Sequence, residues 1–586
     1  MTADCLLKIR RRRNRAGRLS VDSFGTRSVA ILVALNVVGI PETSAQAEGE
    51  RAVCNGQIIT DIEVNTRAPY EPKSKKWWTI PIRVANSLHS TTDESVIRRY
   101  LILEPGMQCS EFRRAESERI LRVQPYLASA EIRTLSDGQG GVRLHVETVD
   151  ELTTIVSAGA RGAHITGLRL GDRNVAGSAT SVIAQWRQSD LRDVFGVKFT
   201  DYQFLGRRYI LDADISRREI GSPNWAADIR HPFLTDQQRF AWRVKAEDTR
   251  ELFHFLREGD VPSAVIGIER SFLDAGGVVR IGLPGRLSLF GISFSRETDA
   301  AVHPPNLDTT VNYSTLLAPY RRRNNSRINA LWALRNIYFR RVERFDALNA
   351  AQDIRLGFQI GTLFGRSISV GGATDDDILV AADIYGGLGG ERTFFRISIR
   401  GEGHQNYDKN EWDGILGSGN LAAYRRLGEK HTLKMNVDWS GGWKQRTPFQ
   451  LSLGDSRGGV RGYRKSRAGG GRRGVLRLEE RWYVGDFREQ AGLALAFFAD
   501  AGRLWAGDVP YGVDTPVKIG AGVGLLAAVP KGSKRTWRLD VAFPLSADGK
   551  AKWEFRLSNV NANRVEWREP QDVARSRERA VITRTN

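Results

Sequence analysis

The 586-residue sequence is poor in cysteine and methionine, with three of each, and it lacks any long apolar run. Its apolar stretches fall short of the roughly 18–20 residues that a helix needs to cross a bilayer, which excludes a helical membrane transporter. Wholesale disorder is also excluded, because 9% of the residues are aromatic and apolar residues occur along the whole chain. This length ordinarily suggests about three or four domains, although one barrel can absorb several hundred residues.

The formal net charge is +20, of which residues 1–47 contribute +5. The remainder contains no basic helix, no zinc-ligand spacing and no aromatic and basic platform of the kind that nucleic-acid modules use. Its basic residues instead alternate with apolar ones in strand-like stretches, which places them on one face of a sheet. We therefore expect no nucleic-acid partner.

The N-terminus has the features of an export signal. An arginine-rich start precedes the apolar run Val29 to Ile40, and Ala45-Gln46-Ala47 follows as a small-residue pattern that a signal peptidase accepts. The pattern predicts a signal peptide over residues 1–47. Cleavage leaves two cysteines, Cys54 and Cys109, which can form a disulfide in an exported protein; two separately buried thiols are the alternative.

Residues 48–152 have the strand, helix, helix, strand, strand order of a small α+β domain. This order, with the turn-forming stretch Leu101 to Gly106, resembles the polypeptide-transport-associated (POTRA) domain. The resemblance implies a periplasmic domain. We expect its exposed edge strand near Val142–Val149, where an extended polypeptide can add as a further strand.

Residues 153–560 alternate between apolar and polar residues in runs of about nine to twelve, the length that a tilted strand needs to cross a hydrocarbon core. Closing such strands into a barrel satisfies every backbone polar group in lipid. The pattern predicts a transmembrane β-barrel of about sixteen antiparallel strands with a polar lumen. A polar tail over residues 561–586 follows, expected to be flexible or helical and able to sit at the periplasmic mouth.

Several short motifs follow one another along this region. They are Asp172 to Gly177, Gly458-Gly459-Val460-Arg461-Gly462-Tyr463, Phe498-Ala499-Asp500-Ala501-Gly502, Gly520 to Gly524 and Arg538 to Leu545. Their order on successive strands, behind a signal peptide and a POTRA-like domain, resembles the outer-membrane superfamily of BamA, TamA and the two-partner secretion transporters.

The resemblance implies a loop, Val460-Arg461-Gly462-Tyr463, that folds back into the lumen. Arg461 would then pair with Asp500 in the wall motif Phe498, Asp500 and Gly502. A planar guanidinium can bind a carboxylate through two hydrogen bonds, and glycines allow the loop to turn in a narrow space. The alternative is a mobile extracellular loop with an incidental arginine.

The same resemblance implies an assembly or insertion factor in the outer membrane of a Gram-negative bacterium, which inserts unfolded clients through a barrel seam. The expected partners are unfolded outer-membrane or secreted polypeptides, outer-membrane lipid and periplasmic accessory proteins. A polypeptide secretion pore and a passive channel that favours anions remain as alternatives.

Two stretches imitate enzyme motifs, but their context is wrong. Gly454 to Gly458 fits a hydrolase elbow and Gly469 to Gly474 fits a dinucleotide fingerprint, yet neither is followed by the helix that these motifs require. The eight histidines show no metal-ligand spacing. We therefore expect no catalysis, no metal and no cofactor.

Overall fold

The computed structural model describes residues 51–70, 89–161, 164–188, 193–217, 223–259, 261–303, 311–408, 410–454, 457–487, 490–546, 553–561 and 567–577. The predicted signal peptide, residues 1–47, lies outside these ranges. None of the helices in the described ranges is long and apolar enough to cross a membrane.

The N-terminal domain packs two helices against a four-stranded sheet with the order β2-β1-β4-β3. Strand β1 pairs in parallel with β4, and the other pairs are antiparallel. A disulfide joins Cys54, just before β1, to Cys109 in β2. The elements are β1 (Asn55–Arg67), α2 (Glu94–Arg98), β2 (Gln108–Ser110), α3 (Glu111–Val123), β3 (Leu127–Ser136) and β4 (Val142–Asp150).

The expectation that Val142–Val149 forms an exposed edge is wrong. Strand β4 lies inside the sheet, between β1 and β3. The physical reason is its apolar face: Val142, Leu144 and Val146 are all buried, and an interior position covers them on both sides. The long edge strand of this sheet is β3.

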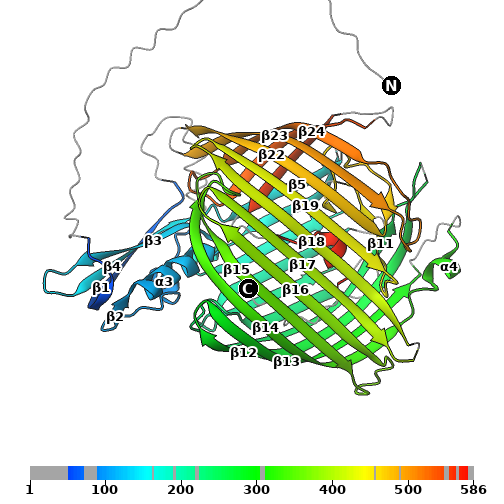
Figure 1. The fold of residues 1–586 in the computed structure, drawn as a ribbon, viewed down its shortest axis with the longest axis horizontal. Coiled ribbons are helices and arrows are strands. Elements are labelled where there is room, and N and C mark those ends of the chain that lie inside the picture. The colour runs from blue at the N-terminus through cyan, green and yellow to red at the C-terminus, as the bar shows by residue number, and fades with distance from the viewer. Residues whose placement is uncertain are drawn as a thin grey trace, which may run out of the picture. The chain divides into compact units, whose positions relative to one another are not determined.

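The rest of the chain forms a closed antiparallel barrel of twenty strands among the described residues (Figure 1). The fold class predicted from the sequence is therefore confirmed. The strands are β5 (Thr154–Arg161), β6 (His164–Asp172), β7 (Thr180–Arg187), β8 (Val194–Phe204), β9 (Tyr209–Ser216), β10 (Asn224–His231), β11 (Phe240–Phe255), β12 (Ala264–Leu283), β13 (Arg286–Val302), β14 (Arg323–Glu343), β15 (Ala351–Ser367), β16 (Asp377–Gly389), β17 (Thr393–Asn406), β18 (Glu411–Leu427), β19 (His431–Trp443), β22 (Arg472–Phe487), β23 (Ala491–Trp505), β24 (Lys518–Ala528), β25 (Arg535–Pro544) and β26 (Glu554–Asn561).

Smaller elements lie in the connections between barrel strands and after the last one. They are η2 (Val175–Gly177), α4 (Tyr313–Leu317), β20 (Leu451–Ser452), β21 (Gly469–Gly470) and α5 (Gln571–Ala574).

The two faces of the barrel wall differ as the alternation predicts. In β25, Trp537 and Leu539 are about two-fifths exposed, whereas Arg538 and Asp540 are buried. The same holds in β12, where Leu273 is exposed and its neighbour Asp274 is fully buried. Apolar side chains thus face outward, toward lipid, and charged side chains line a polar lumen.

The predicted number of about sixteen strands is wrong. Six strands, β5 to β10, occupy the short stretch from Thr154 to His231 and have only 8–11 residues each. The sequence estimate assumed evenly long strands and loops. Alternation within a strand does not report how many strands close the sheet, because closure depends on hydrogen bonds between strands.

Strand length divides the barrel into two parts. The tall wall, β11–β19 with β22 and β23, has strands of 13–21 residues. The low wall, β24–β26 with β5–β10, has strands of 8–11 residues. The seam between the first and last strands, β5 and β26, lies within the low wall.

The N-terminal domain contacts turns at one end of the barrel. Asp150 accepts hydrogen bonds from the backbone N–H of Thr92 (2.8 Å) and from its hydroxyl (2.7 Å), and Asn174 donates to the same hydroxyl at 2.8 Å. Asn174 belongs to the predicted Asp172–Gly177 turn, so this motif faces the domain. On the opposite wall, Arg122 of α3 binds Asp353 of β15 at 2.7 Å.

Candidate functional site

The candidate site lies where the loop between β19 and β22, residues 444–471, meets the inner wall. Short strands β20 and β21 pair within the loop. Gly462 has a φ of +91°, a left-handed conformation that favours glycine, and it lies next to Pro544. Val460 is fully buried. The loop is therefore packed against the barrel wall.

Two glycines of the wall allow the loop to approach closely. A Cβ at Gly520 of β24 would collide with the carbonyl oxygen of Arg461, and a Cβ at Gly502 of β23 would stand 2.6 Å from Val460 Cγ2. Both glycines belong to motifs found in the sequence. Because these two positions carry no side chain, the loop can lie directly against the wall.

Arg461 binds Asp500 through a bidentate pair. Its Nε donates to Oδ2 at 2.7 Å and its Nη2 to Oδ1 at 2.6 Å, and its backbone N–H also donates to Oδ2 at 3.1 Å. The guanidinium lies over the ring of Phe498, 3.6 Å from its centroid. Both charged side chains are buried. The structure thus brings together Arg461 with Phe498 and Asp500, as the resemblance implies.

Tyr463 fastens the loop to the low wall. Its hydroxyl donates to the carbonyl oxygen of Ile519 in β24 at 3.0 Å and accepts from the backbone N–H of Ser546, just after β25, at 3.2 Å. All four residues of the loop motif therefore contact the wall or its connections.

Glu479 of β22 is the centre of this site, and sequence reasoning missed it. Its carboxylate binds Arg461 at 2.9 Å, Arg538 of β25 at 2.8 Å and Arg481 at 2.6 Å. Arg538 also binds Asp540 at 2.7 Å. The available signal was its place as an acid on the polar face of a strand that follows the motif loop, but many residues share that description.

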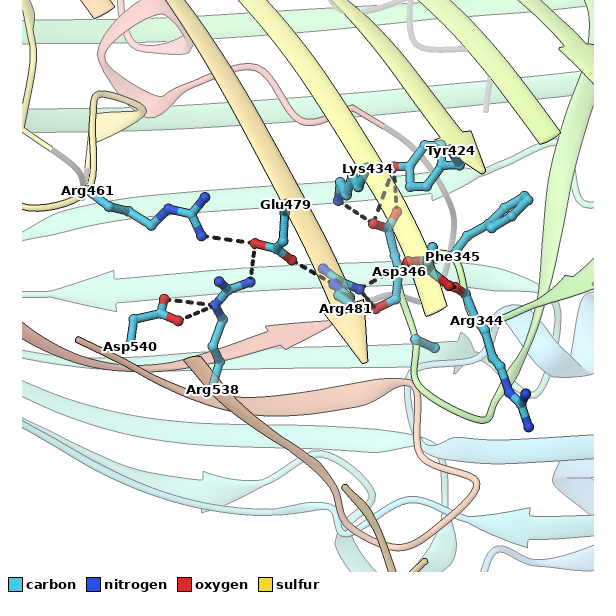
Figure 2. A network of polar contacts seen from close by, with 12 residues as sticks. Arg344, Phe345, Asp346, Tyr424, Lys434, Arg461, Glu479, Arg481, Arg538 and Asp540 are labelled. Atoms are coloured by element: carbon cyan, nitrogen blue, oxygen red, sulfur yellow. Dashed lines mark hydrogen bonds and ion pairs between the residues drawn. The ribbon is translucent and has the colours of Figure 1, made fainter. Parts of the chain in front are cut away.

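The network continues to the turn between β14 and β15, residues 344–350, at the end of the barrel that carries the N-terminal domain. Arg481 donates to the carbonyl oxygens of Phe345 and Asp346 at 3.0 and 2.9 Å, and the Asp346 carboxylate accepts from Tyr424 at 3.1 Å and binds Lys434. Figure 2 shows this chain of contacts from Arg461 through Glu479 to Asp346. The network therefore joins a loop from one end of the barrel to a turn from the other.

Apolar packing holds the same turn inside the barrel. Phe345 is fully buried against Phe394 and Tyr424, and Leu348 packs on small residues of β23 and β24. The sequence shows apolar residues between Arg344 and Ala350, but it does not show that this turn points inward.

The charged residues of this site contact one another in the described part of the chain. Within the described ranges, no group of three or more His, Cys, Asp or Glu side chains could hold a metal ion. Gly469 and Gly470 form β21 and are followed by strand β22, so the dinucleotide-like stretch has no helix after it. The charged groups instead bind one another, which is the arrangement of a structural brace.

The fold and the site together define a large transmembrane β-barrel with an inward-folded loop and one N-terminal α+β domain. No protein-family model and no curated protein matches the chain. Among solved structures, the chain is similar to BamA from Haemophilus ducreyi lacking POTRA domains 1–3, with 13% identity, a TM-score of 0.33, and 86% of this chain and 85% of that chain covered.

Two CdiB structures are similar as well. The one from Acinetobacter baumannii has 10% identity, a TM-score of 0.37, and coverage of 86% of this chain and 74% of that chain. The one from Escherichia coli has 12% identity, a TM-score of 0.36, and coverage of 88% and 92%. At TM-scores this low the likenesses support no argument about function, which depends instead on the chain's own residues.

Proposed function

We propose that this protein is an outer-membrane assembly factor of a Gram-negative bacterium, which receives unfolded polypeptides in the periplasm and inserts them through the seam between β26 and β5. The observation that carries the proposal is the low wall. Both seam strands have eight residues, fewer than the roughly 9–11 that a tilted strand needs to cross the hydrocarbon core. Lipid beside such strands must thin to match them, which favours insertion there.

Seam opening needs no chemical fuel. Separated seam strands expose backbone N–H and C=O groups, which are costly in lipid. A client strand can satisfy them by adding to the exposed edge. Each client strand added replaces the edge that it covered, so the driving force is the folding of the client itself.

The Arg461 loop supports this role as a brace. Through Glu479 it ties β22 to Arg538 of β25, which is the strand next to β26. It therefore holds the low wall up to β25 against the tall wall, and movement concentrates at β26 and β5.

In the described part of the N-terminal domain, side chains and backbone groups already occupy part of the β3 edge. On β3, the backbone N–H of Ile132 donates to Glu118 at 3.3 Å and its carbonyl accepts from Arg114 at 2.7 Å. Further along, Thr134 accepts from the backbone of Ala52 at 3.1 Å. Client pairing at the seam is therefore favoured over pairing at this domain.

Cross-linking the seam tests the proposal. Cysteine at Val156 of β5 would be combined in turn with cysteine at Phe555, Leu557 and Asn559 of β26, and the oxidised pair that forms would be reconstituted in liposomes. We expect the locked barrel to lose its acceleration of the folding of an unfolded outer-membrane client, and reductant to restore it.

The control is a cysteine pair at Ser271 and Thr298, which are register partners in the tall wall. Because the reductant also acts on the native Cys54–Cys109 disulfide, this control variant shows whether reduction of that disulfide alone changes activity. A locked seam that still accelerates client folding would refute seam insertion. Passage of a polypeptide through the lumen of the locked barrel would favour the secretion pore instead.

A further inference from the structure

The C-terminal segment, residues 567–577, lies inside the barrel. It follows β26 and contains the single-turn helix α5, drawn in red within the strands in Figure 1. This place differs from the periplasmic mouth suggested by its polar sequence. Its polar groups bind inward-facing residues of several strands of the tall wall, which only a segment in the lumen can reach together.

Three residue pairs hold the segment on the tall wall. The Asp572 carboxylate accepts two hydrogen bonds from Arg473 of β22, at 2.6 and 3.1 Å. The indole N–H of Trp567 donates to Asp438 of β19 at 3.0 Å. At its other end, Arg577 binds Glu402 of β17 at 3.0 Å.

Further contacts cross the lumen. Arg270 of β12 donates to the carbonyl oxygen of Arg575 at 3.2 Å. Glu569 pairs with Arg577 inside the segment at 2.9 Å and also bonds Ser418 of β18. The segment therefore spans from β12 to β22 and obstructs the space between them.

Its apolar anchor is small. Val573 is fully buried in a cluster with three residues of the loop between β19 and β22, the lumen loop, and three of the wall: Phe449, Leu453 and Val460, and Leu416, Val475 and Leu504. One buried valine is a modest anchor beside the many apolar side chains that hold an ordinary structural element. The remaining contacts are hydrogen bonds and ion pairs, which the polar and charged groups of a competing polypeptide can replace one for one.

We propose that residues 567–577 are a removable plug, which occupies a polypeptide-binding site of the lumen and keeps the pore closed until it is displaced. The tether to β26 gives the segment a high effective concentration at its site, so the segment returns to the site when a competing polypeptide leaves. The site accepts a short polypeptide that carries an aromatic residue and, five and six residues later, an acid and a valine. This inference concerns pore closure and does not depend on the proposed insertion of clients.

Conductance in planar bilayers tests the plug. The full chain is compared with a chain truncated after Asn561. We expect a several-fold larger conductance for the truncated protein, and block of that conductance by a synthetic peptide of residues 567–577. A peptide of the same composition in scrambled order is expected to leave the channel open.

A charge-swap series tests the same point without truncation. Arg473→Asp and Asp572→Arg are each expected to raise the open fraction several-fold, and the double variant is expected to return it toward that of the unaltered chain. Arg568→Gln, at an exposed position of the segment, is the matched control with no expected change. These variants keep the whole chain, so they decide the question even if the truncated protein does not fold.

Equal conductance of the full and truncated chains would overturn the proposal, as would single charge reversals that leave the open fraction unchanged. Client insertion is measured separately. A plug that fails these tests leaves seam insertion standing, and failed insertion leaves the plug standing.

Discussion

The tall wall and the low wall are built from the same alternation of apolar and polar residues, but they differ in strand length and in what they hold. The tall wall carries the C-terminal segment through Arg473, Asp438 and Glu402. The low wall contains the seam, and the two seam strands, β5 and β26, have eight residues each. A long ladder of hydrogen bonds gives rigidity, whereas a short one gives a place to open.

The lumen loop is the link between the two walls. Arg461 binds Asp500 and Glu479 on the tall wall, and Glu479 binds Arg538 on the low wall. Tyr463 reaches Ile519 of the low wall. Breaking this link is the direct way to test whether the two walls behave as separate parts.

The largest effect is expected from Glu479→Ala. It leaves Arg461, Arg481 and Arg538 close together without their shared acid, and removing one partner of a buried charge network costs about 3–5 kcal/mol. We expect a lower urea midpoint and earlier loss of the folded band on heating. The control is Glu480→Ala on the same strand, where the acid is 43% exposed and pairs only with His431 among the interactions observed for it. Equal losses in both variants would contradict a link centred on Glu479.

A smaller effect is expected from Gly520→Ala. The added methyl group collides with the Arg461 carbonyl oxygen, and overpacking of this kind costs about 1–3 kcal/mol. We expect the loop to lift from the low wall, seen as faster protease cleavage within residues 444–471 while the barrel stays folded. Gly417→Ala in β18 is the control, because nothing lies within 4 Å of a Cβ there. Unchanged cleavage of the Gly520 variant would show that the loop does not rest on β24.

The smallest effect is expected from a change of pH on the docking of the N-terminal domain to the low wall, at the connection between β24 and β25. Lys534 is buried under the N-terminal domain, where its ammonium donates to the carbonyl oxygen of Leu127 at 3.3 Å, and burial lowers its pKa to about 8. The docked state thus binds fewer protons than the undocked state, whose lysine titrates near about 10.4. Docking is therefore weaker below the lower pKa and strengthens as pH rises from about 8 to about 10.

Spin labels on the domain and the barrel would report the docked fraction between about pH 7 and 10. Lys534→Met should remove the rise, because no buried amine then titrates. The Lys534 ammonium also donates to the carbonyl oxygen of Arg122, so the contact of Arg122 with Asp353 belongs to the same docking surface. A docked fraction that falls with rising pH would contradict the assignment to Lys534.

Much of the barrel could be predicted from local pattern. Side chains alternate between the two faces of a strand, so the sequence predicts which residues face lipid. In β25, for example, Trp537 and Leu539 are exposed on the outer face, whereas Arg538 and Asp540 are buried on the inner face. The number of strands did not follow, because the six short strands from Thr154 to His231 look like fewer and longer ones when only average spacing is used. Strand count is a property of pairing between strands, which no single strand encodes.

The site was predicted in part. Arg461 and Asp500 were selected from motifs and lie together in the structure. Glu479 and Asp346 were not selected, since an acid on a polar barrel face is common. The inward course of the turn at Phe345 was also missed, because a turn's direction depends on the wall that receives it.

The sequence by itself determined the class of protein: alternation over some four hundred residues requires a closed sheet between lipid and water, and the glycines of the motif loop require a tight approach to the wall. Only the tertiary structure decided that the closed sheet has a tall and a low side, that one glutamate joins three arginines across them, and that the C-terminal segment lies in the lumen. The physical reason is that alternation is local, whereas ladder length, charge pairing and occupancy of the lumen depend on residues hundreds of positions apart.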